Sequence, residues 1–503
     1  MYIFVPDIMK AKQILLTGTI LPSVIAPSFS MGRAKEKPDL KPNVLFIFVD
    51  DLRREMGAYG SPVITPNMDA LAASGSLFTR QFVSCPTSGA SRYGLLTGHY
   101  PSDPAHLSNE ACRTEITEKS GQNIPETMFH QLRRNGYRTV GIGKISHYVD
   151  GYVYGYEAPV SDIRERPHSW DEMLFDPGKW GNGWNAFFGY ADGQNRQSMH
   201  RRVKPYECFD GDDESYPDGL TARLAADKLK ELSRTGEPFC LAVGFFKPHL
   251  PFTSPKAYWD LYDESQIALS PEPDLPYGMD RGFLHDSDEF RGYLLGEEKP
   301  ARDKRVSDAY ARKLRHAYYA CVSYADAQIG KVLAALEESG VADRTIVILW
   351  GDHGWHLGDQ RVWGKHTVLE TAASSALIVR APGRKAGIVN DRVVSSIDIY
   401  PTLMDLCGVP RPEGLDGHSF APLLDEPGDP SWEDVAYTYY RHVLSMRTPR
   451  YRLARIIRDG KITTELYEYG TDRIEHENIA PLHPDIVETL MPLWEKGRSA
   501  AFR

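Results

Sequence analysis

Short apolar runs alternate with amphipathic stretches along most of the chain. Nearly continuous apolar runs predict strands buried on both faces of a sheet, at 43–49, 137–142, 239–245, 345–350 and 376–379. Apolar residues at helical spacing predict helices at 65–74, 123–135, 220–234, 307–338 and 396–406. Strands that alternate with helices in this way indicate an α/β domain built on a mostly parallel sheet.

The pattern changes after Leu424, and 425–431 form an acidic linker rich in Pro and Gly. Short strands are predicted beyond it at 435–440, 451–457 and 463–469, followed by a helix at 486–495. We therefore expect a catalytic α/β domain over 43–424 and a small antiparallel α+β domain over 434–503. The weakly periodic stretches 148–218 and 253–303 are interpreted as long loops that shape a pocket rim.

The first residues have the pattern of an export signal. Lys10 and Lys12 precede a mostly apolar run at 14–26, and small residues follow to Ser30. We expect a signal peptide over 1–30 and a linker over 31–42, which implies export to the periplasm or the outside of a cell. A disordered tail is the alternative. The apolar run is too short to span a membrane, so no stable membrane insertion is expected.

The net charge of the chain limits the classes of molecule that it is expected to bind. The net charge of −10 over 503 residues argues against general affinity for nucleic acid, so a polyanionic substrate would need local cationic groups. Six widely spaced cysteines show neither metal-ligand spacing nor a dense disulfide framework.

Polar residues follow four of the predicted strands within a few positions: Asp50, Lys144, His249 and Asp352. The carboxyl ends of parallel strands share one edge of a sheet, where open α/β sheets bind their ligands. One such placement would be unremarkable, but four predict a single site.

The segment 84–101 changes from small, turn-forming residues to an apolar stretch closed by Gly98. This pattern predicts a loop that leads into a short helix, with the Ser88 hydroxyl near the helix N-terminus, where an anion is favoured. Residues 88–98, SGASRYGLLTG, resemble the signature of the type I sulfatases, in which Arg stands four residues after the first position. Only Ser88 satisfies that register, through Arg92, because Gly89 stands four residues after Cys85.

The resemblance extends over most of 43–480 and is greatest to the iduronate-2-sulfatase-like branch. It implies an alkaline-phosphatase-like fold and a serine-type enzyme, in which Ser88 is oxidised to formylglycine. Ala90 replaces the commoner Pro of the signature, which the serine subclass tolerates. It further implies a bacterial source and a partner, the radical maturase that performs this oxidation without oxygen.

A divalent cation is expected to be held by Asp50, Asp51, Asp352 and His353, together with the modified Ser88. Three carboxylates favour Ca²⁺ or Mg²⁺, whereas a histidine would suit Mn²⁺ or Zn²⁺ better. The resemblance favours Ca²⁺. For Asp352 and His353, a polar turn without a metal is the alternative.

The resemblance also implies roles for five further residues. Arg92 would hold the modified side chain, Lys144 and Lys365 would contact sulfate, and His147 would hydrogen-bond the modified residue. His249 would protonate the leaving alcohol, which suits a group that titrates near neutrality. Candidates for sugar recognition, each with packing or surface exposure as the alternative, are His99, Tyr100, Trp355, His356, Trp363 and His366.

These features predict a sulfatase that acts on a sulfated glycan or oligosaccharide, with a 2-O-sulfated uronic acid as a candidate. One hydroxyl of the hydrated aldehyde would attack sulfur, and the second would later lose its proton and expel sulfate. Two alternatives stay open. One is a phosphate or phosphonate ester hydrolase that uses unmodified Ser88, and the other is an inactive, glycan-binding homologue.

Overall fold

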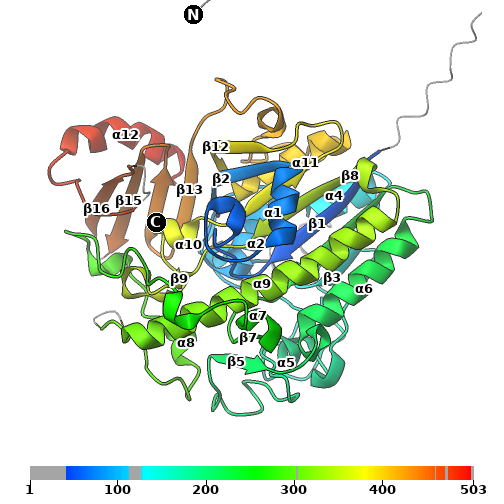
Figure 1. The fold of residues 1–503 in the computed structure, drawn as a ribbon. Helices are drawn as coiled ribbons and strands as arrows, with labels where there is room; N and C mark the ends of the chain where they lie inside the picture. Colours follow the sequence, from blue (N-terminus) through cyan, green and yellow to red (C-terminus); the bar gives the residue numbers. More distant parts are fainter. Residues whose placement is uncertain are drawn as a thin grey trace, which may run out of the picture. The chain divides into compact units, whose positions relative to one another are not determined.

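The computed structural model describes residues 41–112, 125, 127–301, 304–458, 460–470 and 474–499 (Figure 1). The predicted signal peptide and nearly all of the predicted linker lie outside these residues. Residues 41–503 form one compact unit. Within the described part of the chain, no helix has the length and apolar character needed to cross a bilayer.

An eight-stranded sheet forms the centre of this unit (Figure 1). Its strands, in spatial order, are β12 (Ile388–Ser395), β2 (Ser76–Phe82), β11 (Leu377–Arg380), β8 (Thr345–Gly351), β1 (Asn43–Val49), β6 (Phe239–Phe245), β3 (Arg138–Gly143) and β4 (Glu172–Leu174). Every neighbouring pair is parallel except those of β11, which runs antiparallel to both β2 and β8. The prediction of a mostly parallel sheet is confirmed.

Helices cover both faces of the sheet. One core contains Leu45, Ile47 and Val49 of β1 together with residues of α1 (Pro66–Ala73), α6 (Pro217–Leu232) and α9 (Asp308–Glu338). The other contains Val44, Phe46 and Phe48 with residues of α2 (Ser88–Thr97), α4 (Met128–Arg134) and α11 (Ile399–Cys407). Successive β1 side chains thus enter opposite cores, which explains why this strand is apolar throughout.

Shorter elements complete the large domain: α5 (Gly183–Phe187), β5 (Tyr206–Phe209), β7 (Phe252–Pro255), α7 (Lys256–Trp259), α8 (Asp288–Arg291), β9 (His356–Leu357), β10 (Trp363–Gly364) and α10 (Glu370–Ala373). Several of them, with β4, fall inside 148–218 and 253–303, which were expected to be loops only. That expectation is wrong in detail, because β4 extends the large sheet.

The sequence patterns did not predict β2 or β12, which form one side of the sheet. In β2, Thr79, Arg80 and Gln81 interrupt the apolar run, and Asn390 to Arg392 do so in β12. The register of this pair shifts between Asn390 and Val393, so the alternation of buried and exposed positions is broken there.

The C-terminal part is a four-stranded antiparallel sheet of β13 (Ala436–Tyr440), β14 (Val443–Arg447), β15 (Tyr451–Arg458) and β16 (Lys461–Glu468). Trp494 of α12 (Pro484–Lys496) packs against this sheet in a core shared with Tyr439 and Leu453. The antiparallel α+β prediction is confirmed, although it missed β14, which follows β13 after a two-residue turn.

Candidate active site

The end of β1 carries two buried carboxylates. Asp50 and Asp51 follow Val49 directly, and neither has any exposed surface. Asp51 adopts a left-handed backbone conformation (φ 58°), which is uncommon for a residue other than glycine. Two hydrogen bonds hold it there: its N–H donates to Asp352 Oδ1 (2.9 Å), and its carbonyl accepts from the Tyr318 hydroxyl (2.7 Å). The parallel strands β1 and β8 therefore bring their terminal carboxylates together.

Ser88 is the first residue of α2, as predicted, and is buried beside these carboxylates. Its Oγ lies 2.9 Å from His353 Nε2 and 3.4 Å from Asp50 Oδ1. The following Gly89 allows this close packing, because a Cβ there would lie 2.3 Å from the backbone oxygen of Asn109. The first turn of α2 therefore fixes the hydroxyl at the helix N-terminus, where free N–H groups favour negative charge.

Arg92 lies one turn later on α2 and is fully buried. Its guanidinium donates to Asp352 Oδ2 (3.2 Å), to Asp50 Oδ1 (3.1 Å), and to the carbonyls of Lys144 (2.8 Å) and Ile145 (3.1 Å). A planar guanidinium can join several acceptors at fixed angles, which an ammonium cannot. Arg92 thus ties together the ends of β1, β3 and β8.

Two lysines pair with the β1 carboxylates. Lys144 Nζ lies 2.5 Å from Asp50 Oδ2, and Lys365 Nζ lies 2.9 Å from Asp51 Oδ1. Burial by itself would raise the pKa of Asp50, but the charge of Lys144 and its neighbours outweighs burial and holds that pKa well below its usual value. Burial raises the pKa of Asp51 well above its usual value, and Lys365 opposes the rise only in part.

His249 also reaches this site, together with a carboxylate that the sequence patterns did not reveal. His249 Nε2 lies 2.8 Å from Oε1 of Glu289, whose Oε2 lies 3.4 Å from Lys365 Nζ. The other ring nitrogen, Nδ1, lies 2.6 Å from the Leu250 carbonyl. Both ring nitrogens of His249 thus face acceptors, which suits a protonated imidazolium that donates from each nitrogen. Burial lowers the pKa of His249, and Glu289 opposes that effect. Glu289 lies on α8, inside a stretch expected to be loop, where no motif pointed to it.

His147 is near the site but does not bond to residue 88. Its Nε2 lies 3.5 Å from the Tyr156 hydroxyl, and its ring lies 5.4 Å from that of Trp184. Within the described part of the chain, no hydrogen bond joins His147 to Ser88. Burial, followed by the charge of Lys144, holds the His147 pKa well below its usual value. Its expected contact with the modified residue stays a prediction.

The residues predicted to bind a metal fit a divalent cation. Ligand atoms of Asp51, Asp352 and His353 lie within 4.8 Å of one another, as do those of Asp50, Asp51 and His249. Asp51 belongs to both groups, and its Oδ2 is buried without a hydrogen-bond partner among the described residues. A buried carboxylate oxygen without a partner is costly unless a ligand satisfies it. Hard carboxylate oxygens suit Ca²⁺ or Mg²⁺.

The site combines many charges of both signs. Four carboxylates and three permanent cations meet there: Asp50, Asp51, Asp352 and Glu289, with Arg92, Lys144 and Lys365. A proton on His249, both of whose ring nitrogens face acceptors, would add a fourth positive charge and offset the four carboxylates. A divalent cation would then make the site positive, which favours an anionic ester.

The six candidates for sugar recognition do not gather in one place. His99 and Tyr100 follow the far end of α2, where His99 lies 3.3 Å from Asp416 and Tyr100 packs against Tyr437 of β13. This location is at the opposite end of a ten-residue helix from Ser88, so the structure contradicts their placement in the pocket.

The remaining four candidates divide between core and rim. His356 and Trp363 are buried, and His356 Nε2 bonds to Thr367 (2.8 Å), so packing explains both. Trp355 is also buried, with the Lys365 ammonium 5.4 Å from its ring centroid. His366 alone keeps partial exposure, and it stacks on Tyr440 of the C-terminal sheet.

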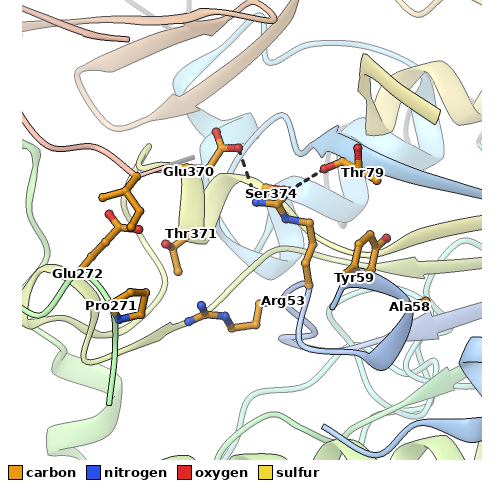
Figure 2. A pocket seen from close by; sticks show the side chains of 11 residues that line it. Arg53, Ala58, Tyr59, Thr79, Pro271, Glu272, Glu370, Thr371 and Ser374 are labelled. Carbon is orange, nitrogen blue, oxygen red and sulfur yellow. Dashed lines mark hydrogen bonds and ion pairs between the residues drawn. The ribbon is translucent and has the colours of Figure 1, made fainter. Parts of the chain in front are cut away.

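A separate polar cavity of about 400 Å³ lies elsewhere in the molecule (Figure 2). Arg53, Tyr59, Glu272 and Glu370 are among its lining residues, and none of the predicted site residues lines it. Arg53 is already bound to the Trp355 carbonyl (3.0 Å) and to Asp359 (2.7 Å). This cavity therefore plays no part in the predicted chemistry.

Solved structures define the class of the fold. The chain resembles a phosphonate monoester hydrolase from Silicibacter pomeroyi with a TM-score of 0.70 and 23% identity, covering 91% of this chain and 95% of that one. It resembles a protein solved in complex with its substrate D-glucosamine-2-N,6-O-disulfate with a TM-score of 0.67 and 21% identity, covering 91% and 97%. The protein therefore has the alkaline-phosphatase-like fold.

Sequence comparisons give the family. The model described as Sulfatase matches residues 42–409, and one described as N-sulphoglucosamine sulphohydrolase, C-terminal, matches 351–496. Human iduronate 2-sulfatase is 30% identical over 76% of this chain and 67% of its own length. A sulfatase from Formosa agariphila is 28% identical over 94% and 89%. The chain belongs to the sulfatase family, whose members are sulfuric ester hydrolases.

Proposed function

We propose that this protein hydrolyses sulfate monoesters of a sulfated glycan through a formylglycine made from Ser88. The observation that supports this most is the position of the Ser88 hydroxyl, at a helix N-terminus and 2.9 Å from His353 in the carboxylate cluster. A nucleophile in this position faces the lysines that would neutralise the ester. The resemblance to serine-type sulfatases supplies the modification.

Different residues of the site would perform different steps of ester hydrolysis. Lys144 and Lys365 offset the negative charge of the ester, which otherwise repels a nucleophile. Arg92 orients the carboxylates Asp50 and Asp352. His249 donates a proton to the departing sugar oxygen, and Glu289 holds its ring in place.

Asp50, Asp51, Asp352 and His353 would hold the metal, for which Ca²⁺ is our proposal. When bound, the ion would supply charge neutralisation and lower the pKa of the attacking hydroxyl. The second hydroxyl of the hydrated aldehyde then loses its proton as sulfate leaves, which regenerates the aldehyde. An unmodified serine would need a separate water for that step.

The fold bears on the alternative hydrolase. The phosphonate monoester hydrolase fold keeps that activity as the second candidate, with sulfate favoured by family membership.

The substrate proposal is a sulfated glycan, with a 2-O-sulfated uronic acid as the first candidate. It rests on the similarity to iduronate 2-sulfatase and on the fold shared with a protein solved with a disulfated glucosamine. We also propose that a radical maturase modifies Ser88 and that the protein is exported by a bacterium.

The test combines mass spectrometry with sulfate release. Protein from an anaerobically grown host should carry a residue-88 peptide about two mass units lighter than serine predicts, because oxidation removes two hydrogens. That protein should release sulfate from a panel of heparin and chondroitin sulfate disaccharides and from an aryl sulfate. If the modified protein hydrolyses aryl phosphonate monoesters but no sulfate ester, the alternative hydrolase is correct. If residue 88 is always serine and nothing is hydrolysed, the protein is an inactive homologue.

A further inference from the structure

A second pocket lies against the candidate active site, on the side of the C-terminal sheet. It has a volume of about 300 Å³, and α8, the segment before it, and the β13–β14 turn line it. Arg441, His442 and Arg458 come from the C-terminal sheet, and His285 and Asp286 come from the large domain. The pocket is therefore made jointly by the two sheets of the molecule.

Three aromatic side chains in contact, those of Tyr440, His366 and His285, lie between this pocket and the Ser88 site. The His366 ring lies 5.6 Å from that of Tyr440, nearly parallel to it, and 4.8 Å from that of His285. The residue before His366 is Lys365, which contacts Asp51 and Glu289. A ligand that extends past His366 would thus contact the pocket on one side of this residue and the Ser88 site on the other.

The charges of the pocket favour an anion. Its two carboxylates are occupied by one arginine, since Arg291 pairs with Asp286 (3.2 Å) and with Asp288. Arg441 and Arg458 make no ion pair with any acidic group in the described part of the chain. Asp286 and Asp288 with Arg291, Arg441 and Arg458 leave one net positive charge at the pocket. Guanidinium groups bind carboxylate and sulfate through two parallel hydrogen bonds.

The β13–β14 turn places Arg441 beside His366. Arg441 is the first residue of this two-residue turn, and its φ of 51° is the positive value that such hairpin turns take at this position. Its guanidinium lies 5.2 Å from the ring centroid of Tyr440, whose ring is stacked on that of His366. The turn therefore holds the Arg441 side chain where the pocket meets His366.

We infer that Arg441 and Arg458 form an anion subsite, which binds the carboxylate or second sulfate of the sugar next to the one that is desulfated. The inference rests on the proposed function and adds that the substrate is an oligosaccharide with at least two anionic groups. Neither arginine touches the reacting atoms, so both determine specificity and not chemistry.

The test compares Arg441→Ala with wild type on two classes of substrate. For the best disaccharide of the heparin and chondroitin sulfate panel, kcat/KM should fall about ten- to a hundredfold, the effect of losing a charged hydrogen bond. Turnover of 4-nitrophenyl sulfate, which has no second anion, should stay within twofold. Carboxyl-reduced and singly desulfated forms of the disaccharide identify the anion, because the form that lacks it should lose its sensitivity to Arg441→Ala.

The matched control is Arg450→Ala, which removes an exposed arginine from the next turn of the same sheet, where it pairs with Glu468. It should leave both substrates unaffected. An equal loss on the aryl sulfate and the disaccharide, or no loss on either, overturns the inference.

Failure of the proposed function gives a different result. If the wild type hydrolyses no sulfate ester, the anion subsite is tested instead by calorimetry, which measures the affinity of the wild type and of Arg441→Ala for the heparin disaccharide. Binding at least tenfold weaker to Arg441→Ala than to wild type supports the subsite, and equal binding overturns it.

Discussion

Two clusters of buried charge differ in how their charges are matched. In the second cluster, Arg447 pairs with Glu370 (2.9 Å) and Arg452 with Glu475 (2.5 Å), so both acids face an arginine. The Tyr469 hydroxyl donates to Glu475, and the Arg447 guanidinium stacks on the Tyr469 ring. The Arg447–Glu370 pair joins α10 to the C-terminal sheet, and Glu370 also lines the cavity of Figure 2.

The Ser88 cluster is arranged differently. Ligand atoms of its carboxylates and histidines converge within 4.8 Å of one another, whereas the carboxylates of the second cluster face arginines. Both clusters are buried to a similar degree, and both contain buried polar atoms without a hydrogen-bond partner among the described residues, Asp51 Oδ2 in one and Arg452 Nη1 in the other. Converging carboxylate and imidazole ligands thus indicate a site that a cation completes, whereas arginine–carboxylate pairs indicate a structural contact.

The largest expected effect is on chemistry. Ser88→Ala should lower the rate of sulfate release by about 10⁴-fold or more, as loss of a nucleophile does, with an unchanged melting temperature. The matched control is Cys85→Ala, three residues earlier. Burial raises the pKa of the Cys85 thiol to about 12, so we expect this variant to keep its activity. Activity lost in Cys85→Ala and kept in Ser88→Ala would show that the motif register is wrong.

The next effect is on stability and belongs to the second cluster. Arg452→Met should lower the free energy of unfolding by about 3–5 kcal/mol, because it leaves Glu475 buried without its cation. Urea titration measures this loss, and activity per folded molecule should not change. The double variant Arg452→Met, Glu475→Leu should recover most of it. A loss below about 1 kcal/mol would mean that this pair is no more than a surface ion pair.

Metal binding tests whether the Ser88 cluster is the cluster that a cation completes. Saturating Ca²⁺, at about a hundred times its Kd, should stabilise the wild type by about 2.7 kcal/mol, and a chelator should remove both this gain and the activity. Asp51→Asn should abolish the gain, measured against the metal-free form of the same variant. Asp227→Asn, which removes an exposed carboxylate on α6, should respond to Ca²⁺ as wild type does. A full Ca²⁺ response in Asp51→Asn would place the ion elsewhere.

The smallest effect for a single step in conditions is the change in stability per pH unit at the cavity of Figure 2. Burial, with the nearby charges of Glu475 and Asp359, raises the pKa of Glu272 from 4.5 to about 8. The folded protein then holds a proton that the unfolded chain has lost, so stability falls as pH rises from about 4.5 to about 8. The slope is at most about 1.4 kcal/mol per pH unit. Glu272→Gln should flatten this slope, whereas an unchanged slope would assign it to other groups.

Motif register and apolar periodicity predicted where most of the candidate site residues lie on the helices and strands. β1 and β6 were predicted to the residue, and each site residue that follows a strand or begins a helix lies where the pattern indicated. The sequence patterns did not predict β2 and β12, because charged and polar residues interrupt the apolar runs of these strands. They did not predict a role for Glu289, because a single acidic residue in a loop-rich stretch has neither periodicity nor a motif around it.

The sequence by itself determined which residues end the buried strands, because chain order fixes the residues that come directly after an apolar run. It also determined that Ser88, and not Cys85, begins α2 in register with Arg92. Only the tertiary structure decided which distant side chains meet. The packing of separate elements placed Glu289 beside His249 and Arg441 beside the Tyr440–His366 pair. It also placed Tyr100 beyond the end of α2 that is farther from Ser88. The physical reason is that such contacts depend on how separate elements pack, which local spacing along the chain does not encode.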